Sequence, residues 1–227
     1  MKRWKETAEV FGSVARRPET GRRAAPVAGV VLAAGSSTRM GRNKLLLRLD
    51  GEAVVRRAAP RALAAGLDPV VVVLGHEADL AAAELEGLAV RIVVNADHTG
   101  GIHTSRRAGL AAVPPEAHAA VVLLADMPFV TEQMLATLVA RHRDSGAPLV
   151  VSEYAGEQAP PTLYDRSLFP ELLGGEGCSK RVIRNHAGDA VTVAWPAAAL
   201  TDLDRPEDYE RALAKGPGPE ARCVPSS

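Results

Sequence analysis

The sequence predicts an α/β fold in which a mostly parallel, doubly wound (Rossmann-like) sheet carries helices on both faces of a single domain. Short runs of Val, Leu and Ala alternate along the chain with segments of helical periodicity. The runs are almost continuously apolar, as expected of parallel strands that are buried on both faces. A chain of 227 residues is long enough to form one such domain with a sizeable core.

The individual elements follow from the same alternation. We expect strands at Val27–Ala33, Pro69–Gly75, Val90–Asn95, Ala119–Ala125 and Pro148–Ser152. We expect helices at Glu52–Ala65, Ala78–Leu85, Ser105–Ala112 and Thr131–Arg143. Pro60 lies inside the first helix, where a proline costs about 3 kcal/mol. We therefore expect that helix to kink or to break in two at Pro60.

The two ends of the chain differ in composition from the part between them. Residues 1–26 are polar and basic, and we interpret them as a flexible extension with one short helix around Glu6–Ala15. Residues 216–227 are rich in Pro and Gly and are typical of a loose tail. The expected domain therefore spans residues 27–215.

Composition excludes several classes of function. Lys plus Arg and Asp plus Glu both total 27, so no net charge draws the protein to nucleic acid or to a membrane. Aromatic residues make up only 4%, which disfavours base-stacking platforms. The two cysteines make neither a disulfide framework nor a zinc site. The N-terminus shows no continuous apolar h-region and no apolar run approaches the length of a membrane span, so we expect a cytoplasmic protein.

The segment Val27–Lys44 contains the strongest functional signal. An apolar strand opens into a Gly/Ser/Thr loop that carries Arg39 and Lys44. Small residues let backbone N–H groups approach phosphate oxygens, and the two cations would neutralise phosphate charge. The position of Lys44 after Gly41 does not fit a Walker A loop, and the dinucleotide fingerprint G-x-G-x-x-G is absent. The alternative is a strand followed by an ordinary polar turn.

The loop LAAGSSTRMGRNK, at Leu32–Lys44, resembles the signature LAAG-x-S-x-RMG-x-x-K of the MobA-like nucleotidyltransferases. Within that family it is most similar to the molybdenum cofactor cytidylyltransferase branch. The resemblance implies a nucleotidyltransferase sheet in which this loop binds the nucleotide. The nucleotide-binding residues it implies here are Leu32, Ala33, Ala34, Gly35, Ser36, Ser37, Arg39 and Lys44.

Asp126 is the predicted partner of the loop. It directly follows the expected strand Ala119–Ala125, and ligands of open α/β sheets lie beyond the carboxyl ends of the strands. If this strand neighbours Val27–Ala33, a carboxylate here could hold Mg²⁺ on a triphosphate. The family's metal-binding aspartate stands in the same Asp-Met-Pro context. The alternative is a capping residue, because Pro128 and Thr131 announce a helix.

A second acidic element, Thr201–Tyr209, resembles the family segment D-I-D-T-P-E-D, whose acidic residues complete the metal site. Asp202 and Asp204 are two residues apart, so they share one face of an extended chain. Asp204 is also followed by Pro206 and Glu207, which is a capping pattern. Its role, metal ligand or helix cap, stays open.

Two further segments concern the substrates. His98–Leu110 resembles the family element that lines the base and ribose, with Gly101 and Ser105 matching. Arg106 stands where the family usually has Leu, so it either contacts a phosphate or points to solvent. Gly156–Leu173 resembles the segment that receives the acceptor, although Ala159 and Pro160 depart from the family pattern. After it, Lys180 and Arg181 are candidate clamps for an acceptor phosphate.

These residues favour transfer of a nucleoside monophosphate from an NTP to a phosphorylated acceptor, with Arg39, Lys44 and Asp126 as catalytic residues and Mg²⁺ as cofactor. The resemblance implies CTP, since Ala34 leaves less room beside the base, and molybdopterin as acceptor. It also implies transient contact with a molybdoenzyme or its chaperone. A guanylyltransferase, another phosphate-acceptor nucleotidyltransferase, a nucleotide-binding oxidoreductase and a non-catalytic cofactor chaperone remain alternatives.

Overall fold

The protein is described here by a computed structural model that covers residues 25–174 and 179–215. Nearly all of the expected N-terminal extension, with its helix at Glu6–Ala15, and the C-terminal tail lie outside the described residues. The two cysteines, Cys178 and Cys223, also lie outside them. Among the helices of the described residues, none has the length and apolar character needed to cross a membrane.

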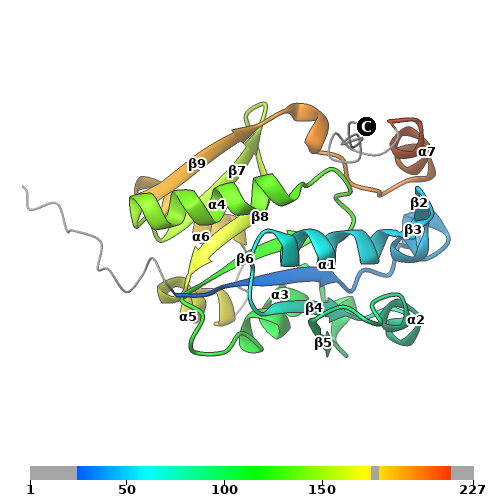
Figure 1. The fold of residues 1–227 in the computed structure, drawn as a ribbon, viewed down its shortest axis with the longest axis horizontal. Helices are drawn as coiled ribbons and strands as arrows, with labels where there is room; N and C mark the ends of the chain where they lie inside the picture. The colour runs from blue at the N-terminus through cyan, green and yellow to red at the C-terminus, as the bar shows by residue number, and fades with distance from the viewer. Residues whose placement is uncertain (1–24, 175–178, 216–227) are drawn as a thin grey trace, which may run out of the picture.

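A sheet of seven strands forms the centre of the protein, in the order β5-β4-β1-β6-β8-β7-β9 (Figure 1). The strands are β1 (Val27–Ala33), β4 (Val70–Leu74), β5 (Val90–Val94), β6 (Ala119–Leu124), β7 (Leu149–Tyr154), β8 (Glu157–Asp165) and β9 (Ala190–Trp195). Strand β8 runs antiparallel to its neighbours β6 and β7, and the other pairings are parallel. The predicted mostly parallel, doubly wound sheet is therefore confirmed.

Helices cover both faces of this sheet (Figure 1). Helices α1 (Val54–Ala64) and α4 (Glu132–Ser145) pack on one face, and α3 (Ile102–Ala111), α5 (Phe169–Leu173) and α6 (Ser179–Asn185) pack on the other. The short helix α2 (Ala78–Ala83) and the final helix α7 (Pro206–Lys215) flank the end where β1 finishes. A two-stranded hairpin, β2 (Arg48–Leu49) and β3 (Glu52–Ala53), precedes α1.

Alternation along β1 shows how one strand serves two cores. Val27 and Val31 belong to the cluster under α1 and α4, whereas Val30 and Leu32 belong to the cluster under α3. Gly109 brings α3 unusually close to the sheet, because a Cβ added there would stand 2.4 Å from Cγ1 of Val30. The apolar runs of the sequence are thus strands buried on both sides.

The structure differs from the sequence-based expectation in several elements, among them α1, β8 and β9. Helix α1 continues through Pro60 as one element, so of the two expected outcomes, a kink or a break, the break is wrong. Strand β8 was not expected, because Pro160 and Pro161 disfavour a strand. These prolines fall where the pairing of β7 with β8 changes register, a position that tolerates the missing N–H groups. Strand β9 was also missed, although its residues alternate between partly buried and exposed positions, which is a strand signal.

β1 is the point at which the chain changes the side of the sheet to which it adds strands. Its neighbours are β4, reached through α1, and β6, reached later in the chain. Leu32 lies opposite Leu124 in the β1–β6 pairing, so both strands finish at the same edge of the sheet. In open α/β sheets this switch point is where ligands bind. The loop after β1 and Asp126 after β6 are therefore brought together.

Candidate active site

The loop after β1 contains two residues in left-handed backbone conformations. Ser37 has φ of 53° and Gly41 has φ of 66°, a region in which small or polar residues are tolerated. The Ser37 hydroxyl accepts a hydrogen bond from the backbone N–H of Lys44 at 3.1 Å. This bond closes the loop across its base and sets the position at which the Lys44 side chain leaves the backbone.

Lys44 is the centre of the charge cluster. Its ammonium group donates to the carboxylate of Asp204 at 2.8 Å and forms a second ion pair with Asp126. Arg39 adds a further ion pair to Asp204 at 2.7 Å. The side chains of Lys44 and Asp126 are only 11% and 15% exposed, whereas that of Arg39 is 63% exposed. Two cations and two carboxylates from three distant segments thus meet at one point.

The charges in this cluster shift one another's pKa values. Burial alone would lower the pKa of Lys44, but the nearby carboxylates of Asp126 and Asp204 outweigh it and the pKa is raised. The hydrogen bond from Lys44, together with the charges of Lys44 and Arg39, lowers the pKa of Asp204. For Asp202, desolvation and then the negative charges of Asp126 and Asp204 raise the pKa to about 6. Lys44 is therefore a firmly charged cation, and Asp202 lies in a region of excess negative charge.

The capping alternative for Asp204 does not hold. Helix α7 begins at Pro206, and the backbone N–H of Arg205 donates to the carboxylate of Asp208 at 2.8 Å. Asp208 is therefore the residue that satisfies this helix start, while Asp204 faces Lys44 and Arg39. The capping alternative for Asp126 is equally unsupported, because Thr131 caps helix α4 by accepting from the N–H of Met134.

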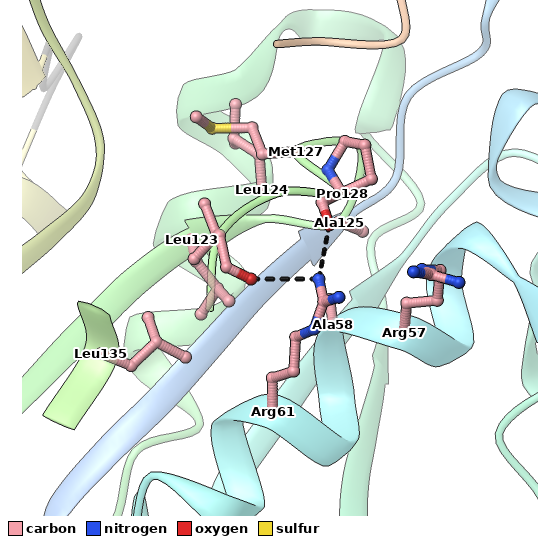
Figure 2. Close-up of a pocket in the computed structure, with 10 residues that line it drawn as sticks. Arg57, Ala58, Arg61, Leu123, Leu124, Ala125, Met127, Pro128 and Leu135 are labelled. Atoms are coloured by element: carbon pink, nitrogen blue, oxygen red, sulfur yellow. Dashed lines mark hydrogen bonds between the residues drawn. The ribbon is translucent and has the colours of Figure 1, made fainter. Parts of the chain in front are cut away.

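Arg61 of helix α1 fixes the loop that carries Asp126 (Figure 2). Its guanidinium donates to the carbonyl oxygens of Pro128 at 2.6 Å and of Val130 at 3.0 Å. These bonds lie beside a small cavity of about 10 Å³, lined also by Leu123 and Ala125. The backbone carbonyl of Asp126 in turn accepts from the N–H of Leu203, at 3.2 Å, which joins this loop to the acidic segment.

A cavity of about 380 Å³ opens beside the charge cluster. Its lining combines the loop after β1, the end of β6 and the start of α3: Leu32, Ala33, Ala34, Gly35, Ser36, Lys44, Leu45, His98, Thr99, Gly101, Ile102, Ser105, Leu124 and Asp126. Of the sequence-predicted nucleotide residues, Ser37 and Arg39 lie next to this lining rather than in it. The predicted loop, Gly101, Ser105 and Asp126 are thus brought to one cavity.

Two residues of this cavity region were missed from the sequence. Asn95, at the end of β5, donates from its amide to the hydroxyls of Thr104 at 2.8 Å and Ser105 at 3.0 Å. His98 lines the cavity, and its buried Nδ1 has no hydrogen-bond partner among the described residues. The sequence signal that could have identified them is their position, because both residues follow the carboxyl end of strand β5.

A second cavity, of about 330 Å³, adjoins the first and shares Leu32, Ile102 and Leu124 with it. Lys180 lines it, whereas Arg181 is exposed and does not appear in the lining of either cavity. Arg106 lines it too, although the residue is only 3% exposed. The alternative in which Arg106 points to solvent is therefore wrong.

The acidic residues suit a divalent cation only in combination with a substrate. Among the described residues, no three His, Cys, Asp or Glu side chains gather closely enough to hold an ion by themselves. Asp126 and Asp204 nevertheless supply hard oxygen donors at one point, and Mg²⁺ is usually held by one or two carboxylates plus substrate phosphates. The donor set fits such a cation.

Proteins of known name are similar to this chain in sequence, and solved structures are similar to it in fold. The purine catabolism protein PucB of Bacillus subtilis (strain 168) is 32% identical over 197 residues, which cover 80% of this chain and 93% of that protein. Nicotine blue oxidoreductase of Paenarthrobacter nicotinovorans is 39% identical over 118 residues, 52% of this chain and 57% of that protein. A crystal structure of Rv0371c from Mycobacterium tuberculosis H37Rv in complex with manganese has a TM-score of 0.69 at 29% identity and covers 84% of this chain and 99% of that one.

Family membership follows from a match that spans most of the domain. The MobA-like NTP transferase domain matches residues 29–191, which include the loop after β1, Asp126 and both cavities up to α6. The resemblance of Leu32–Lys44 to the MobA-like nucleotidyltransferases is thereby confirmed. The chain belongs to the MobA-like NTP transferase family and is a nucleotidyltransferase.

Proposed function

We propose that the protein transfers a cytidylyl group from CTP to a phosphorylated cofactor, such as molybdopterin, and releases pyrophosphate with the help of Mg²⁺. One observation supports this most strongly. Arg39, Lys44, Asp126 and Asp204 converge beside a cavity of about 380 Å³, whose other lining residues are mostly small or apolar. Such a cavity fits a base and ribose, and the charge cluster fits a triphosphate.

The reaction needs positioning and charge neutralisation more than it needs proton transfer. A phosphate oxygen of the acceptor attacks the α-phosphorus of CTP, and the bond from that phosphorus to the bridging oxygen of the β-phosphate breaks. A phosphate is already a competent nucleophile near neutral pH, so no general base is required. Lys44 and Arg39 neutralise the leaving pyrophosphate. When bound on Asp126 and Asp204 or Asp202, Mg²⁺ would add charge stabilisation at the phosphate oxygens.

The preference for CTP over GTP is supported by the crowding around Ala34. This residue lines the cavity and is 5% exposed. A Cβ added to Gly75 would stand 2.8 Å from the methyl carbon of Ala34 and 2.6 Å from Cβ of His98. Gly75 therefore packs tightly against Ala34 and His98, two residues of the cavity lining, so we expect this side of the wall to yield little to a larger base, which favours a pyrimidine over a purine.

The acceptor is assigned to the second cavity because the two cavities meet at Leu32, Ile102 and Leu124. A phosphorylated molecule seated there would extend its phosphate across this shared rim toward the α-phosphate of CTP. Lys180 stands at the lining of the second cavity and can bind acceptor phosphate. Arg181, which is exposed, would have to act from outside the lining.

The test is pyrophosphate release with Mg²⁺, each of the four ribonucleoside triphosphates and reduced molybdopterin as acceptor. We expect release with CTP and at least tenfold less with GTP, and a larger rise in melting temperature with CTP than with GTP. Release that is greatest with GTP would replace the proposal by a guanylyltransferase. No release with any triphosphate, together with an absorbance change of added NADH, would favour the oxidoreductase alternative.

A further inference from the structure

Helix α3 begins with a large apolar side chain that is mostly exposed to solvent. Ile102, the first residue of the helix, is 58% exposed. Five large apolar side chains are exposed among the described residues: Leu80, Ile92, Val94, Ile102 and Leu213. Of these five, only Ile102 lines the first or the second cavity, and it lines both. Single exposed apolar residues are common on protein surfaces, but this one lies where the two proposed binding sites meet.

The backbone that carries Ile102 is held in place by hydrogen bonds. The carbonyl oxygen of Gly101 accepts from the backbone N–H of Thr104 at 3.1 Å. The hydroxyl of Thr104 lies 2.8 Å from the carbonyl oxygens of both Gly101 and Asp97. It also accepts from the side-chain amide of Asn95 at 2.8 Å. The Cα of Ile102 is thus fixed at the start of α3, whereas its exposed side chain can change rotamer rapidly.

The exposure of Ile102 distinguishes it from the other two residues that the cavities share. Leu32 of β1 is 8% exposed, and Leu124 at the end of β6 is half-buried. Their side chains are therefore removed from water to a greater extent before any ligand binds. Ile102 still has apolar surface to lose, and a molecule in either cavity can cover part of it. Two molecules bound together can cover more of it than either one alone, which favours binding of both.

We propose that Ile102 is a positioning residue shared by the two substrates, through which binding of the nucleotide strengthens binding of the acceptor. The inference rests on the proposed function for the contents of the cavities, with the nucleotide in the first and the acceptor in the second. The ligand that binds first fixes the rotamer of Ile102. The second ligand then binds against a side chain that is already ordered, so less conformational entropy is lost. Because such coupling is reciprocal, the acceptor must strengthen nucleotide binding by the same factor.

The first experiment is NMR of the wild-type protein labelled with ¹³C at the δ1-methyl groups of isoleucine. The sequence contains three isoleucines, Ile92, Ile102 and Ile183. Ile102 lines both cavities, Ile183 lines only the second, and Ile92 lines neither. The ligands are reduced molybdopterin and, with Mg²⁺, α,β-methylene CTP, which cannot release pyrophosphate. We expect the nucleotide analogue to shift the signal of Ile102 alone, molybdopterin to shift those of Ile102 and Ile183, and neither to shift that of Ile92.

The second experiment measures the coupling by calorimetry. The dissociation constant of molybdopterin is determined with and without a saturating concentration of the nucleotide analogue, and the reverse titration is run with molybdopterin saturating. We expect each ligand to strengthen binding of the other about fivefold, at the lower end of couplings between two sites. In Ile102→Ala, which removes the side chain beyond Cβ, this factor should fall to near one. Two controls should keep the wild-type factor: Ile92→Ala, at an exposed apolar position outside both cavities, and Arg107→Gln, at an exposed position farther along α3.

The proposal is overturned if either ligand leaves the Ile102 signal unshifted, if the wild-type factor is near one, or if the factor is unchanged in Ile102→Ala. Circular dichroism shows whether each variant folds, and the NMR titration needs no variant. Failure of the proposed function is distinguishable, because neither experiment requires turnover. Pyrophosphate release in a protein without this coupling refutes only the role of Ile102. Coupling through Ile102 in a protein that releases no pyrophosphate refutes only the proposed reaction.

Discussion

The ion pair between Lys44 and Asp126 predicts a coupling energy that can be measured without any substrate. The perturbation is a double-mutant cycle of Lys44→Met and Asp126→Asn, which remove the charges and keep most of the side-chain volume. The two side chains are 11% and 15% exposed, so their bond is shielded from solvent. A hydrogen bond to a charged group contributes about 1.5–3 kcal/mol, and we expect a coupling in that range.

The chain offers a matched control pair. Arg48 and Glu84 form an ion pair of 2.6 Å between side chains that are 53% and 24% exposed. Solvent-exposed pairs contribute about 0.2–1 kcal/mol, so the cycle of Arg48→Met and Glu84→Gln should give a smaller coupling. The control coupling should also fall further on addition of salt, because solvent-exposed charges are screened more than shielded ones.

The assay is urea unfolding of the seven proteins at neutral pH, with the free energy of unfolding extrapolated to water. Comparable slopes against urea are required, since a changed slope indicates a changed unfolded state. A Lys44–Asp126 coupling no larger than that of the control pair would refute the reasoning. It would show that the cluster leaves Lys44 as loosely held as a surface lysine.

Three further predictions concern other parts of the structure. Gly109→Ala should lower the free energy of unfolding by about 1–3 kcal/mol in urea titrations, because the new methyl would overlap Val30; an unchanged stability would contradict the close packing of α3. Burial raises the pKa of Tyr154, so its contribution to stability is complete below its ordinary pKa of about 10 and is lost as pH rises above it. The melting temperature of Tyr154→Phe should therefore fall less steeply than that of the wild-type protein as pH rises above that value. Equal slopes of melting temperature against pH in the two proteins would refute this. Asn95→Ala should raise the KM for the nucleotide more than it lowers kcat, because Ser105 loses its donor; a change in kcat alone would contradict this role.

The part of the site that the sequence predicts is the part encoded locally. A strand, a small-residue loop and Lys44 follow one another within Val27–Lys44, and Asp126 follows its strand directly, so their meeting needed only the pairing of β1 with β6. The pairing of Asp204 with Lys44 joins residues 160 positions apart. A capping pattern described Asp204 equally well until the fold placed it beside Lys44.

The remaining failures have physical causes of the same kind. Strand β8 contains Pro160 and Pro161, and its pairing depends on a change of register that no local pattern reveals. Helix α1 keeps Pro60 because tertiary packing of its buried face outweighs a local cost. Arg106 is buried because α6, a helix that was not expected, covers it.

The central claim is that Lys44 and Asp126 form the centre at which a nucleotide is transferred. The most direct measurement is steady-state pyrophosphate release from CTP with Mg²⁺ and reduced molybdopterin, in the wild-type protein, Lys44→Ala, Asp126→Ala and the control Arg107→Gln. We predict a loss of about 10²–10³-fold in turnover for each of the first two variants, as when one charge-stabilising group is removed from an active site. The control should retain wild-type turnover. Near wild-type turnover in both Lys44→Ala and Asp126→Ala would contradict the claim.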